Sequence, residues 1–137
     1  MSAPVTLLVH GGAGTLTRAD LSPAQELEYR DALGQALRAG QSLLLRGASA
    51  VDAVVAAVSV LEDCPLFNAG KGSVFTHEGR NEMDAAVMDG ATGQAGAVAG
   101  VVSVRNPVLA AQSVMQRSGH VLLIGQGAEA FAQSQGL

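Results

Sequence analysis

Apolar positions in the first half of the chain recur with helical spacing and predict two consecutive helices. Ser22-Pro23 is a typical helix start, because serine caps free amide groups and proline fits the first helical position. Apolar residues then recur every three or four positions up to Leu44, and Gly47 is suited to end the helix. A second helix is expected after Ser49, where residues 53–61 are apolar on nearly every side. Such a pair indicates a helical layer held between a sheet and another subunit.

Shorter apolar runs predict strands. Residues 5–10 are rich in β-forming side chains and stop at a glycine-dense turn, so we expect a buried strand there. Residues 73–76 and 81–88 predict a hairpin, and residues 94–104 predict a third antiparallel strand beside it. Further along, the pattern predicts a helix from Asn106-Pro107 to Arg117, a strand at 120–124 and a helix over 128–133. We therefore expect one layered α/β domain over residues 1–137.

Composition narrows the class of protein. Of the 137 residues, 48% are hydrophobic and only 3% aromatic, so the core is expected to consist of small aliphatic side chains in closely packed layers. A net charge of −4 without a basic run argues against nucleic acid as a partner. No apolar segment reaches the roughly 20 residues that span a bilayer. The N-terminus also lacks the basic region of a signal peptide, so we expect no membrane association and a cytoplasmic location.

Residues 64–72 form a loop that cannot continue the second helix. Pro65 removes a backbone donor, and Gly70 and Gly72 permit backbone angles that other residues avoid. Main-chain groups in such a loop need unusual partners, and converging carbonyl oxygens suit a hard cation. Asn68 is the side chain of most interest, since an amide can donate to and accept from a hydroxyl nucleophile or a polar substrate. Asparagine also suits a left-handed turn next to glycine, and the two roles can coexist.

The glycine-rich turn after residues 5–10 has several interpretations. A phosphate cradle lacks support, because neither a dinucleotide fingerprint nor a Gly-Lys-Ser/Thr phosphate loop follows His10-Gly11-Gly12. An oxyanion loop of the esterase kind would require a Gly-x-Ser-x-Gly elbow, which the sequence lacks. From the residues alone, a tight strand exit is the simplest interpretation, with His10 as a hydrogen-bonded residue within it.

Other polar groups favour structural roles. Paired carboxylates would suit a glycosidase or a divalent metal site, but the four central acids are spread over strand faces and turns, where we expect solvent-facing or structural roles. These acids are Glu78, Glu82, Asp84 and Asp89. The three histidines lack the spacing of zinc ligands. The single cysteine, Cys64, has no partner for an internal disulfide and no signature of a catalytic thiol around it, so packing is expected.

Several motifs strongly resemble those of plant-type asparaginases, also called isoaspartyl peptidases, among the N-terminal-nucleophile hydrolases. They are Asn68-Ala69-Gly70-Lys71-Gly72-Ser73, Glu82-Met83-Asp84-Ala85, Met88-Asp89-Gly90, His10-Gly11-Gly12-Ala13-Gly14, the run at 96–101, and Arg105-Asn106-Pro107-Val108. The resemblance covers nearly the whole chain, in order. It implies an αββα sandwich to which this chain contributes the α-subunit portion. The β subunit would arise from the same precursor, which cuts itself before a threonine, and the pairs would assemble as an (αβ)2 heterotetramer.

The resemblance also implies a reaction and its residues. The substrates would be small molecules, asparagine and β-aspartyl peptides, which are cleaved by an N-terminal threonine whose own α-amino group is the base. Every threonine of this chain is internal, so no catalytic nucleophile is expected here. Backbone groups of Gly11 and Gly12 would lie near the nucleophile and assist maturation. The side chain of Asn68 would face the active site and serve in substrate binding.

No organic cofactor is implied, but a structural monovalent cation is, sodium or potassium. Its ligands would be main-chain carbonyl oxygens of the loop, those of Leu61, Glu62, Cys64, Phe67, Ala69 and Lys71. Two alternatives to this function stay open. One is a glycosylasparaginase-type amidase. The other is a non-catalytic domain whose glycine turn and acidic hairpin hold a small ligand or ion.

Overall fold

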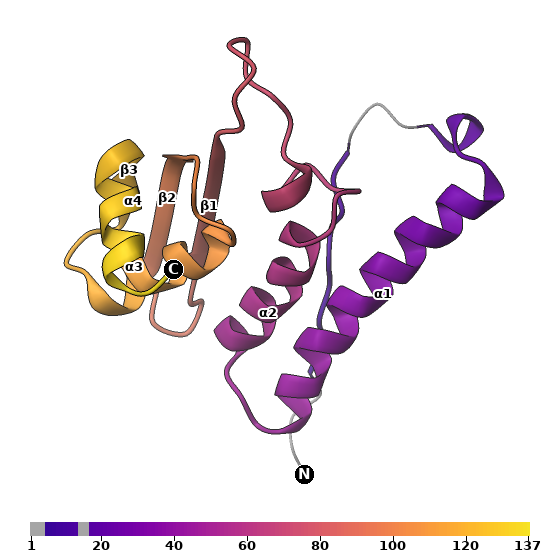
Figure 1. Cartoon of the computed structure of the whole chain (residues 1–137). Helices are drawn as coiled ribbons and strands as arrows, with labels where there is room; N and C mark the ends of the chain where they lie inside the picture. The colour runs from indigo at the N-terminus through magenta and orange to yellow at the C-terminus, as the bar shows by residue number, and fades with distance from the viewer. Residues whose placement is uncertain (1–4, 14–16) are drawn as a thin grey trace.

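A computed structural model describes residues 5–13 and 17–137 of the chain; residues 1–4 and Gly14 of the predicted glycine motif lie outside this part. The helices are α1 (Pro23–Leu45), α2 (Ala50–Glu62), α3 (Pro107–Arg117) and α4 (Gly125–Ser134), with the 3-10 turns η1 (Arg18–Asp20) and η2 (Gly70–Gly72). The strands are β1 (Met83–Met88), β2 (Ala95–Val101) and β3 (Leu122–Ile124). Helices α1 and α2 lie side by side, and the sheet with α3 and α4 lies next to them (Figure 1). The predicted α/β class is thereby confirmed.

The predicted ends of the first three helices agree with the structure, whereas α4 begins at Gly125 and not at the predicted residue 128. The hydroxyl of Ser22 accepts a hydrogen bond from the amide of Gln25, and the side chain of Gln25 accepts one from the amide of Ser22. At the other end of α1, Gly47 has a φ of 79°, a left-handed conformation that favours glycine. Helix α2 begins after Ser49, whose hydroxyl accepts a hydrogen bond from the amide of Asp52.

Small side chains allow α1 and α2 to approach closely. Ala32, Ala36 and Gly40 recur at four-residue spacing and are the buried residues of α1. Opposite them, Ala53 and Ala57 of α2 are almost completely buried. A β-carbon at Gly40 would lie only 2.7 Å from the main-chain carbonyl oxygen of Ala53. The contact is therefore backbone against backbone at this point.

The sheet has the order β1-β2-β3, with β1 antiparallel and β3 parallel to β2. The predicted set of three antiparallel strands is wrong in its first member, because residues 73–76 form only an isolated bridge between Phe75 and Asn81. The side-chain nitrogen of Asn81 donates to the carbonyl oxygen of Ser73 at 2.6 Å, so this side chain takes a main-chain acceptor that a ladder would use. Residues 73–81 therefore form a projecting arm instead of a full hairpin (Figure 1).

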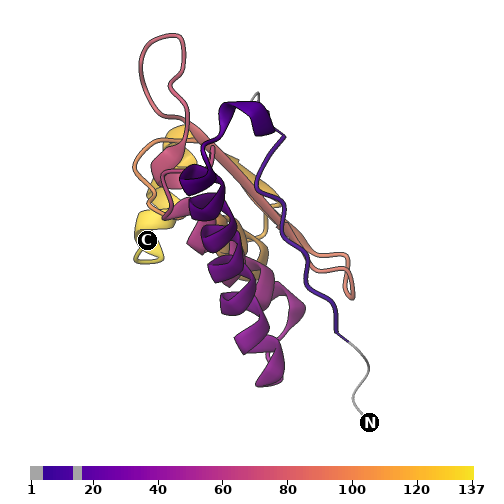
Figure 2. The same ribbon diagram turned by 90° about the vertical axis from the view of Figure 1, so that its right-hand side faces the viewer.

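Residues 5–10 are extended, but the prediction of a buried strand is wrong for them. They form no ladder with any strand of the described part, and Val5 and Leu8 are 64% and 85% exposed. The segment instead runs along α1 and α2 (Figures 1 and 2). Leu7 reaches Gly40, and Val9 packs against the cluster that contains Phe67. One face is thus covered by helices, while no strand of residues 17–137 lies beside the segment.

The two faces of the sheet differ in cover. The inner face packs on α3 and α4 through Val98 and Val101, and a β-carbon at Gly96 would collide with the backbone of α3. The outer face carries Met88, Leu122 and Ile124, which are all more than half exposed. Among the residues that the structure describes, none covers these three apolar side chains fully. No helix within residues 5–13 and 17–137 is long and apolar enough to cross a membrane.

Candidate functional site

The loop after α2 folds so tightly that glycine is required at two places. Gly70 has a φ of 51°, and a β-carbon there would lie 2.3 Å from the carbonyl oxygen of Glu62. A β-carbon at Gly72 would lie 2.2 Å from the carbonyl oxygen of Phe67 and 2.7 Å from that of Pro65. Main-chain oxygens therefore crowd against both glycines.

Three of the six carbonyl groups predicted to bind a cation already accept hydrogen bonds. The carbonyl of Leu61 accepts from Cys64, that of Phe67 from Ala69, and that of Ala69 from Gly72. The oxygens of Phe67 and Ala69 keep a second lone pair, which is compatible with a cation, whereas that of Leu61 also accepts from the amide of Asp63. In the described part of the chain, no three histidine, cysteine, aspartate or glutamate residues are grouped so as to hold a metal ion. Main-chain oxygens are thus the groups that this loop can offer to an ion.

Asn68 lies at the surface of the loop and ties it to the projecting arm. Its side-chain oxygen accepts a hydrogen bond of 2.9 Å from the amide of Val74. This bond uses one of the two lone pairs of the oxygen, and the side-chain nitrogen makes no hydrogen bond with the described residues, so it can donate to a ligand. The arm is held a second time where Asn81 binds Ser73. Asn68 is therefore held in orientation by its hydrogen bond with the arm.

The predicted glycine turn lies against this loop. A β-carbon at Gly11 would lie 2.9 Å from Cε1 of Phe67, the residue that precedes Asn68. Gly12 has a φ of 110°, which favours glycine, and its amide donates to Nδ1 of His10 at 3.0 Å. The histidine thus has the local hydrogen-bonding role expected from the sequence. The structure brings Gly11 next to Phe67 although the two are far apart in sequence.

Two acidic residues at the end of α2 join the helical pair to α3, and sequence reasoning missed their side-chain roles. The carboxylate of Glu62 accepts a hydrogen bond of 2.9 Å from the amide of Val108, in the first turn of α3. Glu62 is only 3% exposed, and this burial raises the pKa of its carboxyl group. Its other oxygen has no hydrogen-bond partner among the described residues. The only sequence signal was a carboxylate at the end of an otherwise apolar helix.

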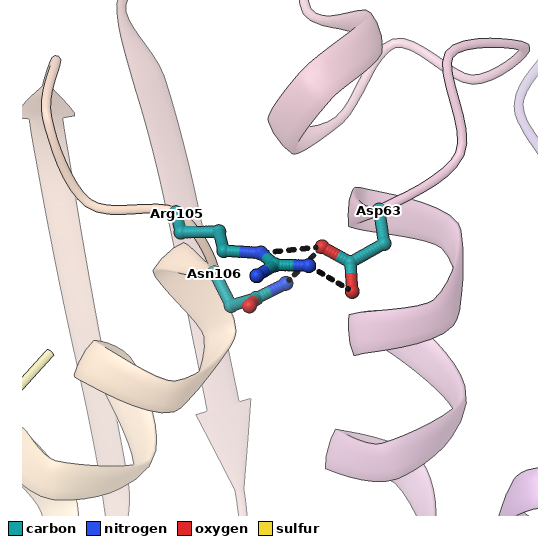
Figure 3. Close-up of polar contacts among 3 residues, drawn as sticks. All are labelled: Asp63, Arg105 and Asn106. Carbon is teal, nitrogen blue, oxygen red and sulfur yellow. Dashed lines mark hydrogen bonds and ion pairs between the residues drawn. The ribbon is translucent and has the colours of Figure 1, made fainter.

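Asp63 forms a second, exposed link beside this buried one (Figure 3). Its two oxygens accept hydrogen bonds from Nε and a terminal nitrogen of Arg105 at 3.1 and 3.2 Å, and the Asn106 side chain approaches at 3.4 Å. The hydrogen bond from Arg105 lowers the pKa of the Asp63 carboxyl group. This link fixes the segment before α3 relative to the loop.

An open pocket of about 490 Å³ lies between the loop and this segment. Its polar lining comes from Asp63, Lys71, Ser73, Asn81, Ser103 and Arg105. The positive charge of Lys71 also lowers the pKa of Asp63, although less than Arg105 does. The pocket therefore has mixed charge and opens beside the loop that carries Asn68.

The remaining predicted groups are mostly structural where the structure gives them contacts. Asp84 accepts a hydrogen bond of 2.8 Å from the amide of Gly100, and Asp89 binds the backbone and side chain of its own turn. Hydrogen bonds from Ala91 and Thr92 lower the pKa of Asp89. Cys64 is partly buried against the α1–α2 core, as the packing interpretation expects.

Comparison with known proteins places these features in a family. A family model described as asparaginase matches residues 3–137. The chain belongs to the asparaginase family. This confirms the resemblance and, with it, the fold class of the N-terminal-nucleophile hydrolases. The asparaginase motifs around Gly11 and Asn68 are the same two segments that meet at Phe67.

Curated relatives in the asparaginase family are longer than this chain. Over 131 residues it is 57% identical to an isoaspartyl peptidase of Salmonella typhimurium, covering 96% of this chain and 42% of the relative. An isoaspartyl peptidase of Escherichia coli is 55% identical over 131 residues, with 96% and 41% covered. A plant-type L-asparaginase of Pyrococcus furiosus is 50% identical over 132 residues, with 96% and 42% covered. The chain thus spans about two fifths of the length of these relatives.

Proposed function

We propose that this chain is the α-subunit portion of an enzyme that hydrolyses L-asparagine and removes N-terminal β-aspartyl residues from peptides. The observation that carries the proposal is the contact of Gly11 with Phe67, which brings the glycine turn to the loop of Asn68. Relatives named isoaspartyl peptidase and plant-type L-asparaginase support the same reaction. The substrates share a carboxyl-bearing aspartyl unit with an amide on its side-chain carbonyl.

The nucleophile in this proposal is the hydroxyl of a threonine at the start of a partner β subunit. Its own α-amino group would accept the hydroxyl proton as the oxygen attacks the side-chain carbonyl of the substrate. Ammonia or the released peptide would leave with that proton, and water would then free aspartate from the enzyme. Asn68 contributes a side-chain N–H group, because this nitrogen makes no hydrogen bond with the described residues and Val74 holds the oxygen of the same amide in place. It would orient an oxygen of the nucleophile or substrate.

Two uncovered features support a partner β subunit from the same precursor. The outer face of the sheet exposes Met88, Leu122 and Ile124, which a second sheet would bury. Residues 5–10 offer an extended backbone that no described strand pairs with. The relatives have more than twice the length matched here, which leaves room for these missing layers. We propose that two such αβ pairs form the (αβ)2 heterotetramer.

A monovalent cation in the loop 61–71 is also part of the proposal. The carbonyl oxygens of Glu62, Pro65 and Phe67 lie 2.2 to 2.7 Å from the positions that β-carbons on Gly70 and Gly72 would occupy, so the glycines let them gather in one compact loop. Main-chain oxygens gathered in this way are the kind of ligand that sodium or potassium binds. The test compares thermal denaturation of the full-length protein in sodium, potassium and choline chloride at equal ionic strength. A higher midpoint in one alkali salt is expected. Equal midpoints in all three would contradict the cation.

Intact mass spectrometry and N-terminal sequencing of the full-length gene product test the main proposal. Two fragments are expected, the second beginning with threonine, together with release of ammonia from asparagine and of leucine from β-aspartyl-leucine. One uncut species without either activity would refute the proposal and leave a ligand-binding domain.

Changing Asn68 separates its two roles. Asn68→Asp keeps an acceptor for Val74 but loses the N–H donor, whereas Asn68→Ala loses both. Both variants are expected to lose activity, and only Asn68→Ala is expected to loosen the arm, as measured by amide hydrogen exchange at Val74. Full activity in Asn68→Asp would contradict the donor role.

A further inference from the structure

Phe67 touches both parts of the candidate site. Its backbone leads directly into Asn68, and its ring lies under the glycine turn, with Cε1 at 2.9 Å and Cδ1 at 3.3 Å from the position of a β-carbon on Gly11. The ring is only 5% exposed. One residue therefore connects the place of Asn68 with that of Gly11.

The side of the Phe67 ring that faces away from Gly11 is packed against other side chains, so the ring has little room to move. Tyr29 of α1 meets it edge to face, with ring centroids 5.8 Å apart and an angle of 84°. Small and aliphatic side chains of both helices complete the cluster, among them Ala36, Ala57 and Leu61. Well-packed interiors respond to a change of shape by shifting neighbours. A displacement of this ring would therefore move the glycine turn.

The glycine turn has little polar support of its own. The hydrogen bond from the amide of Gly12 to Nδ1 of His10 lies within the turn. Among the described residues, no hydrogen bond joins Gly11 or Gly12 to α1, α2 or the loop 64–72. The distance between the turn and the loop is thus set by van der Waals contact, chiefly with Phe67 and with Leu33.

We propose that Phe67 is a positioning residue, whose ring fixes the Gly11–Gly12 turn at the distance from Asn68 that the reaction and the maturation of the precursor require. The inference rests on the proposed function, since it assigns a role within that site. Phe67 does not act on the substrate. It determines where the main-chain groups of the turn stand relative to the side chain of Asn68.

A pair of substitutions tests this contact in the full-length protein. Gly11 has no positive φ, so Gly11→Ala is a steric change, in which the new methyl group meets the ring. A misplacement of about 1 Å can cost roughly 100-fold in rate, so a shift of about half that size predicts a loss of about tenfold in kcat. Phe67→Leu removes Cε1, the nearest atom. It is expected to raise kcat in the Gly11→Ala protein and to lower it in the unsubstituted protein.

Gly12→Ala is the matched control. Its φ of 110° makes alanine strained, but among the described residues beyond its chain neighbours no atom lies within 4 Å of its β-carbon position. Phe67→Leu is therefore expected to rescue Gly11→Ala and not Gly12→Ala. The readouts are kcat and KM for asparagine on fully processed enzyme, and the fraction of precursor processed. Should Gly11→Ala prevent folding, the yield of soluble protein is the readout of the same rescue.

The possible results are distinct. A gain of at least threefold in kcat for Gly11→Ala/Phe67→Leu over Gly11→Ala, without gain on Gly12→Ala, supports the positioning role. A loss of similar size in all three backgrounds means that Phe67 only stabilises the fold, and overturns the inference. If the unsubstituted protein neither cuts itself nor hydrolyses asparagine, the proposed function fails. The rescue measured by soluble yield then still tests the contact between Gly11 and Phe67.

Discussion

The crossing of α1 and α2 gives a sharp prediction, because two glycines of α1 differ only in what lies opposite them. At Gly40, a β-carbon would lie 2.7 Å from the main-chain oxygen of Ala53 and 2.6 Å from Cδ2 of Leu7. At Gly34, the nearest atom is a terminal nitrogen of Arg38 at 3.1 Å, and it belongs to a flexible side chain. The same substitution to alanine is expected to have opposite effects at the two sites.

The expected changes in the free energy of unfolding combine the higher helix propensity of alanine with the cost of fitting its β-carbon. Replacing glycine by alanine inside a helix stabilises it by about 1 kcal/mol. At Gly34 the guanidinium group of Arg38 can move away, so Gly34→Ala is expected to stabilise the protein by up to about 1 kcal/mol. At Gly40 the backbone of α2 must shift, and such overpacking costs about 1–3 kcal/mol. A net destabilisation of about 1 kcal/mol is therefore expected for Gly40→Ala, and a difference of about 2 kcal/mol between the two variants.

Urea denaturation of the full-length protein, followed by circular dichroism, measures this difference. Amide hydrogen exchange in α1 and α2 reports whether the loss is local to the crossing. Equal midpoints for Gly34→Ala and Gly40→Ala, or a stabilised Gly40→Ala, would refute the close backbone contact. Leu7→Ala in the Gly40→Ala background separates the two clashes. It removes the contact with the flexible side chain of Leu7 and leaves the contact with the carbonyl oxygen of Ala53.

Further predictions concern the acidic groups and the loop. Glu62→Ala is expected to destabilise the protein by about 1 kcal/mol in urea denaturation, because α3 loses its capping acceptor. Glu62→Gln keeps that acceptor and should cost less at neutral pH, where the raised pKa of Glu62 means that the buried charge opposes folding. A greater loss for Glu62→Gln would contradict this. Asp63→Asn is expected to lower the free energy of unfolding by less than about 1 kcal/mol, because the ion pair of Asp63 with Arg105 is exposed. At high salt, which screens this pair, the loss is expected to disappear. A loss of several kcal/mol would contradict that assignment. Hydrogen bonds from Ser103 lower the pKa of Glu129 below its ordinary value. Their stabilisation is therefore present above that value and lost as the pH falls through the folded pKa. Stability measured from pH 6 to pH 3 should fall less in Glu129→Gln than in the unsubstituted protein, and parallel curves would exclude the role of Glu129. Gly70→Ala should lower the thermal midpoint because its β-carbon meets the carbonyl of Glu62, and an unchanged midpoint would disprove the tight loop.

The helices could be predicted from the sequence because their signals are local. Caps such as Ser22 and the glycine at 47 act within one turn of the chain, and both are present in the structure. The breaks at Pro65 and Gly70 likewise predicted a loop that is not helical. Membership of the family and the fold class could be predicted too, because short motifs occur in the right order along the whole chain.

Pairings between distant segments could not be predicted in this way. Residues 5–10 have a strand composition, but their neighbours along the chain do not reveal whether a strand lies beside them. At Phe75 only an isolated bridge forms, and the side chain of Asn81 donates to the main-chain oxygen of Ser73. The alternation of apolar and polar residues does not predict such a side-chain hydrogen bond. The buried contact of Glu62 with Val108 joins residues that are 46 positions apart. The predicted cation ligands and the role of Asn68 in catalysis stay predictions.

The bare edge of residues 5–10 has a consequence for how the protein is made. An unpaired extended backbone, in a chain that also exposes an apolar sheet face, favours association with other chains as they are synthesised. A covalently joined partner segment would meet this edge at an effective concentration in the millimolar range, as is typical for short tethers. Synthesis as one polypeptide would thus let the partner segment pair with residues 5–10 before strands of other protein molecules do. In the proposed precursor, a cut made only after folding would keep that advantage, whereas separate synthesis of two subunits would lose it.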